Sequence, residues 1–174
     1  QIKRIFTGGA PVFPNEASLY IKAFPQSVST VVYGSTEAEP ISSIDSRELV
    51  KRSEELSNGL PVGQPYHKAN LKIIEINDDA IPPCSEAELN KMVVREGKIG
   101  EIIVSGPHVL KQYFRNDEAF RNNKIVVDET IWHRTGDSGF TNGKELFLTG
   151  RCKQLIKEGE RYLSPFIIEN QLQN

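Results

Sequence analysis

The chain has 174 residues, of which 38% are hydrophobic and 25% are charged, and its formal net charge is -2. This composition is typical of a folded globular protein, so disorder is not expected. Because basic residues are not in surplus, neither nucleic acid nor an anionic membrane is predicted as the main partner.

The cysteines and the apolar runs narrow the class of protein further. Cys84 and Cys152 lie far apart and lack the spacing of a zinc site or a disulfide scaffold. No apolar run approaches the roughly 18 residues that cross a bilayer, and the first residues lack the apolar stretch of a signal peptide. These features predict a cytoplasmic protein without a transmembrane segment. Because Gln1 stands in place of Met and a strand-like segment follows at once, the chain is also expected to be a piece of a longer protein.

Residues 1–66 are expected to form the end of a large α/β subdomain. A strand over Ile2–Phe6, a glycine turn and a helix over Asn15–Phe24 lead to a second strand, Ser29–Tyr33, that is rich in β-branched residues. This order suits one unit of a parallel sheet, in which ligand-binding loops gather beyond the carboxyl ends of the strands. From Pro40 to Tyr66 the sequence is polar and is predicted to be a connector, with one optional helix around residues 46–56.

Residues 67–151 are predicted to form a β-rich, barrel-like subdomain, because short strand patterns alternate there with turns. A short helix over Asp117–Asn122 is expected, with Asn116 as its cap. The strands expected in this part cover residues 70–76, 100–104, 125–128, 131–134 and 145–148.

Residues 152–174 are interpreted as a hinge followed by the truncated start of a small C-terminal domain. A short strand is expected near Leu155-Ile156, and Ser164-Pro165 is expected to open a helix, with Ser as the cap and Pro in the first turn. The predicted fold class is therefore α+β, a mixed α/β chain.

The most specific local feature is Tyr33-Gly34-Ser35-Thr36-Glu37, in which a strand end runs into a tight turn. Hydroxyl groups and exposed amides in such a turn can hold a phosphate, and the Glu37 carboxylate offers a hard oxygen ligand for Mg²⁺. The same residues also fit a plain strand-terminating turn with solvated side chains. Spacing alone does not choose between the two interpretations.

Five short motifs follow one another along nearly the whole chain. They are Gly8-Gly9-Ala10-Pro11-Val12, Tyr33-Gly34-Ser35-Thr36-Glu37, Gly100-Glu101-Ile102, Arg134-Thr135-Gly136-Asp137, and Gly150-Arg151 with Ile156-Lys157. In this order they resemble the motif series of the adenylate-forming superfamily, which includes acyl-CoA synthetases, aryl-CoA ligases, luciferases and the adenylation domains of peptide synthetases. No single match is specific, but five in the family order argue against coincidence. The chain thus resembles a fragment of such an enzyme, from the adenine-binding motif through the hinge.

The resemblance implies roles for the first motif and for the aromatic residue of the second. Gly8, Gly9 and Ala10 are similar to the backbone stretch that lies against adenine and the acyl pocket, where a missing Cβ allows a flat ring to approach the main chain. Tyr33 resembles the aromatic residue that stacks on adenine.

The rest of the second motif is implied to serve the phosphate and the metal. Gly34 and Ser35 belong to the same nucleotide-binding loop. Thr36 resembles the contact to the α-phosphate, and Glu37 resembles the Mg²⁺ ligand. These last two residues are therefore the catalytic candidates.

The later motifs are implied to hold the sugar and to form the hinge. Asp137 resembles the carboxylate that accepts both ribose hydroxyls, since an ionised carboxylate has two acceptor oxygens and no donor. Arg151 resembles the arginine that contacts the ribose or phosphate with a permanent charge and a planar fork. Lys153 falls at the hinge position and completes the cofactor-binding candidates. Without the resemblance, Asp137 fits a turn and the two cations fit an exposed surface.

Other residues with chemical potential are given structural roles. Trp132 is expected to pack in the core. His67, His108 and His133 show neither metal spacing nor a paired nucleophile, so they are interpreted as surface or structural groups.

Two parts that the superfamily requires are not in this sequence, and a third departs from its pattern. The Pro-Lys phosphate loop is expected before Gln1, and the catalytic lysine after Asn174. After the hinge, Gly159 comes one place early whereas Glu160 keeps its position. Because this loop lines the thiol tunnel in CoA-using relatives, the product is left open between a CoA thioester, a carrier-protein thioester, a free acyl-AMP and a lactone.

The resemblance implies an ATP-dependent, AMP-forming acid-thiol ligase of the kind found in fatty acid metabolism, with ATP or AMP, Mg²⁺ and optionally CoA as cofactors. Its partners are a small carboxylate and, as options, CoA or a carrier protein, and the isolated 174-residue fragment is predicted to be inactive. The alternative is a non-catalytic module that uses the same scaffold to bind a nucleotide or a protein. A dinucleotide-binding oxidoreductase is disfavoured, since Gly8-Gly9-Ala10-Pro11 does not supply Gly-x-Gly-x-x-Gly.

Overall fold

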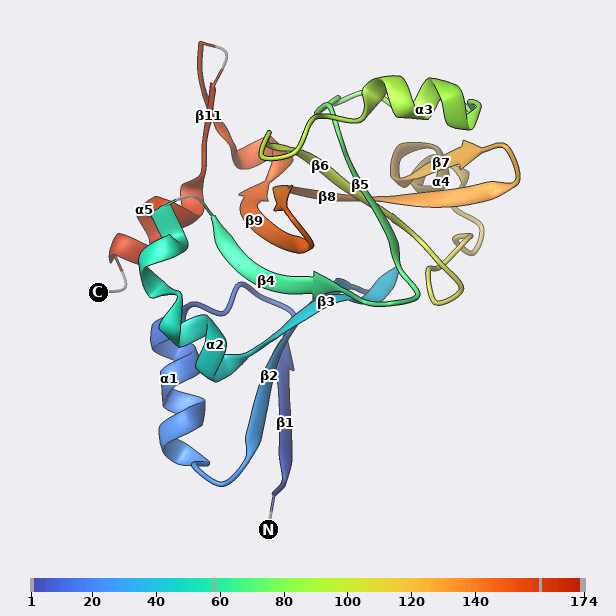
Figure 1. The fold of residues 1–174 in the computed structure, drawn as a ribbon. Helices are drawn as coiled ribbons and strands as arrows, with labels where there is room; N and C mark the ends of the chain where they lie inside the picture. The colour runs from blue at the N-terminus through green and yellow to red at the C-terminus, as the bar shows by residue number, and fades with distance from the viewer. Residues whose placement is uncertain (1, 58, 160, 173–174) are drawn as a thin grey trace.

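The computed structural model describes residues 2–57, 59–159 and 161–172. Within them, nine strands form one mostly antiparallel sheet that runs through both lobes of the molecule (Figure 1). The strand order is β1-β2-β3-β4-β9-β8-β6-β5, and β7 pairs with β8 outside this path. The mixed α+β class predicted from the sequence is confirmed. The strands of this sheet are β1 (Arg4–Gly8), β2 (Val28–Ser35), β3 (Ala38–Asp45), β4 (Leu60–Pro65), β5 (Asn70–Ile74), β6 (Gly100–Ser105), β7 (Lys124–Val127), β8 (Thr130–Asn142) and β9 (Glu145–Arg151).

Helices lie on the outside of this sheet (Figure 1). The α-helices are α1 (Pro14–Ala23), α2 (Ser46–Lys51), α3 (Glu86–Met92), α4 (Asp117–Asn123) and α5 (Pro165–Leu172), and 3-10 turns cover η1 (Ser53–Ser57) and η2 (Cys152–Gln154). 

The first lobe, which holds β1, β2 and β3 with α1 and α2, is built on a parallel strand pair. β1 and β2 are parallel neighbours joined by α1, as the strand–helix–strand order predicted. α1 begins after Phe13 because Pro14 supplies the backbone angle of the first turn and Glu16 Oε2 accepts from the Phe13 amide (3.1 Å). The expected position of β1 was two residues early. Gly8 belongs to the strand and not to the turn after it.

The segment expected to be a connector holds two strands instead. β3 pairs with β2, and β4 pairs with both β3 and β9, so this segment carries the sheet from one lobe to the other. Prolines at positions 40, 61 and 65 obscured the strand pattern, since proline usually argues against a strand. The optional helix is shorter than expected, and it starts at Ser46 because Asp45 Oδ1 accepts from the Arg47 amide (2.8 Å).

The second lobe, which holds β5 to β9, is antiparallel, and the five strands expected there are present. β8 is much longer than predicted and includes the Thr135-Gly136-Asp137 motif, because it pairs in turn with β7, β6 and β9. α4 begins at the expected cap, where Asn116 Oδ1 accepts from the Ala119 amide (2.9 Å). α3 was not predicted, although Ser85 and Glu88 form a capping box that is readable in the sequence.

Among the described residues, the hydrophobic core consists of two clusters of buried side chains. One cluster of buried side chains extends from Ala17 and Ile41 to Leu146. A second cluster lies around α3 and β7 and includes Trp132, which is 5% exposed. Trp132 is therefore a core residue, as predicted. Since β4 bonds to strands on both sides, the sheet is continuous across the expected boundary at residue 66, and the division into domains stays a prediction.

The C-terminal part begins with a hairpin and ends in a helix. β10 (Ile156–Glu158) and β11 (Arg161–Leu163) form an antiparallel pair that projects from the body, and α5 returns to pack near β9 (Figure 1). The Ser164 hydroxyl, expected to cap this helix, donates to the Thr149 carbonyl oxygen (2.7 Å) and so ties α5 to β9. Glu160 lies outside the described residues.

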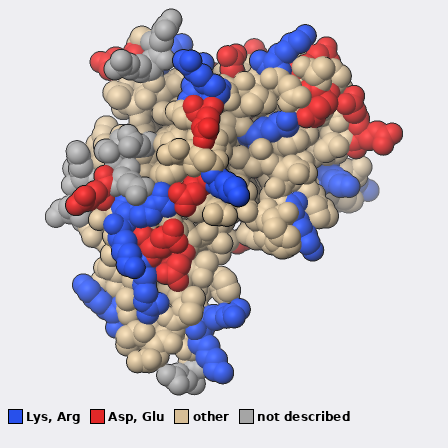
Figure 2. Space-filling model, viewed as in Figure 1, with Lys and Arg blue, Asp and Glu red and all other residues tan. Residues whose placement is uncertain are grey.

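The surface carries mixed charge. Figure 2 shows acidic and basic side chains interspersed over the visible face of the molecule. None of the helices in the described part of the chain has the length and apolar character that a bilayer crossing needs.

Candidate functional site

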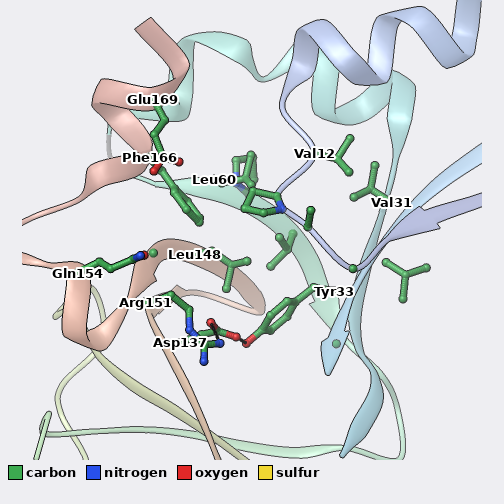
Figure 3. Close-up of a pocket in the computed structure, with 18 residues that line it drawn as sticks. Val12, Val31, Tyr33, Leu60, Asp137, Leu148, Arg151, Gln154, Phe166 and Glu169 are labelled. Carbon is green, nitrogen blue, oxygen red and sulfur yellow. Dashed lines mark hydrogen bonds and ion pairs between the residues drawn. The ribbon is translucent and has the colours of Figure 1, made fainter. Parts of the chain in front are cut away.

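A pocket of about 400 Å³ opens where the first lobe meets β9 and α5. Its size falls within the range of roughly 300–1,000 Å³ that is usual for small-molecule sites. Gly9 and Ala10 line it from the loop after β1. Tyr33 lines it from β2, Asp137 from β8 and Arg151 from the end of β9 (Figure 3). Four motifs that are far apart in the sequence therefore meet at one cavity. Its apolar wall includes Val12, Val31, Leu60, Leu148 and Phe166.

Asp137 is held from two sides in this pocket. The Tyr33 hydroxyl donates to Oδ2 (2.9 Å), and Arg151 Nη1 donates to Oδ1 (2.7 Å), as the dashed lines in Figure 3 mark. Thr135 fixes the backbone beneath, because its Oγ1 accepts from the Asp137 amide (3.0 Å) and donates to the Ile102 carbonyl (2.8 Å). Each carboxylate oxygen has a second lone pair, so Asp137 can still accept hydroxyl donors from a ligand.

The electrostatics of this trio favour a neutral phenol beside a charged guanidinium. Burial, followed by the nearby Asp137 charge, raises the pKa of Tyr33 well above 10. Burial lowers the pKa of Arg151, but the Asp137 charge outweighs it, so the net shift is upward. At neutral pH, Tyr33 is thus a hydrogen-bond donor and Arg151 a cation.

The residues of the glycine motif have two different roles, one in strand packing and one in lining the pocket. A Cβ on Gly8 would lie 2.4 Å from the Val32 carbonyl oxygen, so the close pairing of β1 with β2 requires glycine there. Gly9 has φ 82°, in the left-handed region that glycine tolerates, and a Cβ there would meet no atom within 4 Å. The pocket is lined by Gly9 and Ala10, whereas Gly8 is not among its lining residues.

Thr36 and Glu37 form the two-residue turn between β2 and β3, since Ser35 pairs with Ala38. Gly34 lines the pocket, but Ser35, Thr36 and Glu37 do not. Thr36 is exposed. Burial raises the pKa of Glu37, but hydrogen bonds from its own amide and from Tyr113, together with nearby His133, outweigh this and lower it overall. Glu37 is therefore an ionised carboxylate at neutral pH.

The surroundings of Glu37 include groups that sequence reasoning did not connect with it. The Tyr113 hydroxyl donates to Glu37 Oε1 (3.0 Å). His133 is 3% exposed, and its Nε2 lies 3.8 Å from Glu37 Oε2 and 3.4 Å from Ser35 Oγ. His133 stands directly before the Arg134-Thr135-Gly136-Asp137 motif, and this position is a signal that could have flagged it. No comparable signal points to Tyr113.

Two motif residues act as scaffold. Arg134 and Glu101 form a buried ion pair, in which Arg134 Nη2 lies 2.7 Å from Glu101 Oε2 and Nε donates to the same carboxylate (3.1 Å). Arg134 also donates to the carbonyl oxygens of Asp79 (2.7 Å) and Asn77. This pair joins β6 to β8 and fixes the strand that carries Asp137.

Lys153 stands apart from the other candidates. It is exposed in η2, directly after β9, and is not among the residues that line the pocket. Its neighbour Gln154 does line it, so the hinge segment borders the cavity.

The capacity for a metal rests on Glu37. Among the described residues no cluster of three or more His, Cys, Asp or Glu side chains could hold a metal ion by itself. Mg²⁺, however, is commonly bound by one or two carboxylates together with substrate phosphates and water. An ionised, partly exposed carboxylate fits that donor set.

Known proteins resemble this chain in sequence and in fold. Residues 1–114 match the profile of the family described as AMP-binding enzyme. An olefin β-lactone synthetase from Xanthomonas campestris pv. campestris is 34% identical over 160 residues, which cover 87% of this chain and 28% of that protein. A 4-coumarate–CoA ligase from Humulus lupulus is 29% identical over 173 residues, which cover 99% of this chain and 28% of that protein. The unliganded structure of O-succinylbenzoate coenzyme A synthetase from Bacillus subtilis matches with a TM-score of 0.66 at 25% identity, over 98% of this chain and 32% of that one. The chain thus spans less than a third of the length of these relatives.

Proposed function

The chain belongs to the AMP-binding enzyme family, and on this premise we propose that it is the part of an ATP-dependent, AMP-forming carboxylate ligase that holds the AMP moiety. The observation that carries the proposal is the convergence of Gly9, Tyr33, Asp137 and Arg151 on one pocket. The proposed reaction is attack of a substrate carboxylate on the α-phosphate of ATP, which gives an acyl-adenylate and pyrophosphate. A cytoplasmic location is part of the proposal.

Within this proposal the pocket binds the nucleoside. Asp137 accepts the ribose hydroxyls on its remaining lone pairs, and Arg151 keeps that carboxylate in place while it adds a positive charge near the phosphate. The adenine lies against Gly9, Ala10 and the ring of Tyr33. The hydroxyl of Tyr33 is already bonded to Asp137, so the same residue links the adenine and ribose contacts.

The turn between β2 and β3 is proposed to bind the phosphates of the nucleotide. Gly34 and Ser35 lead into this turn, Thr36 contacts the α-phosphate, and Glu37 provides an oxygen ligand for Mg²⁺. An ion held by Glu37 would supply positive charge to neutralise the leaving pyrophosphate. The protein groups act by holding the carboxylate and the α-phosphate in line, so positioning and charge neutralisation carry the reaction more than acid-base chemistry.

The acceptor of the acyl group is not chosen by these contacts. The relatives above are named for β-lactone formation and for CoA ligation, which are different second steps. Lys153 is proposed as the hinge residue, because it is exposed in the short turn between β9 and the C-terminal hairpin.

Pyrophosphate exchange tests the proposal in the protein made from the complete reading frame that encodes this chain. Asp137→Ala and Glu37→Ala are expected to lower the ATP–pyrophosphate exchange rate at least about tenfold, since each removes charge-assisted contacts. Asp78→Ala and Glu129→Ala remove exposed carboxylates and serve as matched controls. Unchanged exchange in both site variants would refute the assignment. A complete reading frame without the Pro-Lys phosphate loop and the catalytic lysine would favour the non-catalytic module.

A further inference from the structure

The Glu37 side chain needs neighbours to hold it in one orientation. It lies in a two-residue turn and is 25% exposed. A glutamate at such a position has several rotamers open to it unless contacts restrict them. A carboxylate that serves a metal must keep one of its oxygens directed at the ion, so whatever restricts Glu37 contributes to the site.

The segment from Leu110 to Tyr113 is attached to this turn at two points. The Leu110 amide donates to the Glu37 carbonyl oxygen (2.7 Å), and the Tyr113 hydroxyl donates to Glu37 Oε1 (3.0 Å). Lys124, which is 2% exposed, holds the same segment from behind. Its ammonium donates to the Leu110 carbonyl oxygen and lies 5.3 Å from the centroid of the Tyr113 ring. Backbone and buried contacts therefore place Tyr113 without help from a ligand.

His133 lies near the other oxygen of the Glu37 carboxylate. Its Nδ1 lies 3.1 Å from the Asn123 carbonyl oxygen, which can only accept, so Nδ1 carries a proton and donates it there. Its Nε2 lies 3.8 Å from Glu37 Oε2, which is beyond hydrogen-bond distance. Of the two groups, Tyr113 donates a hydrogen bond to Glu37 and His133 does not.

The bond between Tyr113 and Glu37 has one possible direction, because a phenol hydroxyl can donate and an ionised carboxylate can only accept. A phenol that stays protonated beside an ionised carboxylate forms a charge-assisted hydrogen bond, which is about twice as strong as a neutral one.

We propose that Tyr113 is a positioning residue for the metal site: its hydroxyl holds Glu37 Oε1 and so restricts the orientation of the carboxylate that would bind a magnesium ion. The inference rests on the metal role proposed above for Glu37. Tyr113 acts through Glu37 and is not expected to touch the nucleotide.

Tyr113→Phe tests this inference in the protein made from the complete reading frame. The variant keeps the ring and its contact with Lys124 and removes only the hydroxyl. The half-saturating Mg²⁺ concentration for adenylate formation should rise about tenfold, the loss expected when a bond to a charged acceptor is removed. The rate at saturating Mg²⁺ should stay within about twofold, because excess ion can still capture a freely rotating carboxylate. Tyr20→Phe is the matched control, since Tyr20 loses only a hydroxyl that accepts from Thr7 (3.3 Å).

Calorimetry supplies a readout other than activity. With Tyr113→Phe, the affinity for ATP in the presence of Mg²⁺ should fall, whereas the affinity for AMP without metal should match that of the parent. An unchanged Mg²⁺ dependence in Tyr113→Phe, alongside a raised one in Glu37→Gln, would overturn the positioning role and leave the metal role of Glu37 intact. Unchanged behaviour in both variants would overturn the metal role and this inference with it. Equal losses of ATP and AMP affinity would mark Tyr113 as merely structural.

Discussion

The buried ion pair between Arg134 and Glu101 leads to the sharpest stability prediction. The side chains are 8% and 4% exposed, and Arg134 bonds both the carboxylate and two backbone carbonyl oxygens. Arg134→Met keeps much of the side-chain volume and removes the charge. Glu101 is then left as a buried, unpaired carboxylate, and breaking such a pair costs about 3–5 kcal/mol. The carbonyl oxygens of Asn77 and Asp79 also lose a donor, so the upper part of that range is expected.

Urea denaturation of the full protein measures this loss, and hydrogen exchange of the amides in β6 and β8 localises it. Arg95→Met, at an exposed position, is the matched control. Adding Glu101→Gln to Arg134→Met should restore at least about 1 kcal/mol, because no unpaired charge then remains. A free energy of unfolding for Arg134→Met within about 1 kcal/mol of the parent, with unchanged exchange in β6 and β8, would refute the reasoning.

Two further predictions concern titratable groups, of which Lys124 is buried and Cys152 is partly buried. Burial lowers the pKa of Lys124 from 10.5 to about 8. Between pH 8 and pH 10.5 the lysine is therefore protonated in the unfolded chain and mostly neutral in the folded protein. Because the unfolded chain binds more protons there, the stability contributed by Lys124 rises with pH over this range. The parent should therefore gain up to about 3 kcal/mol relative to Lys124→Met between pH 8 and 10.5 in paired urea titrations, and parallel pH profiles would contradict this. Burial, followed by Glu101, raises the pKa of the Cys152 thiol to about 12. Iodoacetamide at pH 8 should modify Cys152 roughly a hundredfold more slowly in the folded protein than in urea, as peptide mass mapping can show, and equal rates would exclude the burial argument.

Sequence patterns predicted the elements whose signals are local. The helix after Phe13 and the cap at Asn116 depend on residues within a few positions of each other. The parallel pair of β1 and β2 followed from the local strand–helix–strand order. The connector prediction failed for the opposite reason. β3 and β4 contain prolines and exist because β2 and β9 pair with them, which no local pattern reveals.

The residues of the candidate site also fall into two groups, those indicated by the sequence and those found only from the tertiary structure. The resemblance carried by the order of the motifs indicated Tyr33, Asp137 and Arg151 from the sequence. Only the tertiary structure decided that these three meet in one pocket and that Gly8 serves strand pairing. It also joined Tyr113 to Glu37, which are 76 positions apart. Contacts between residues so far apart in the sequence form only when the sheet brings both lobes together. The packing of many side chains determines that arrangement, and no single segment of the sequence does.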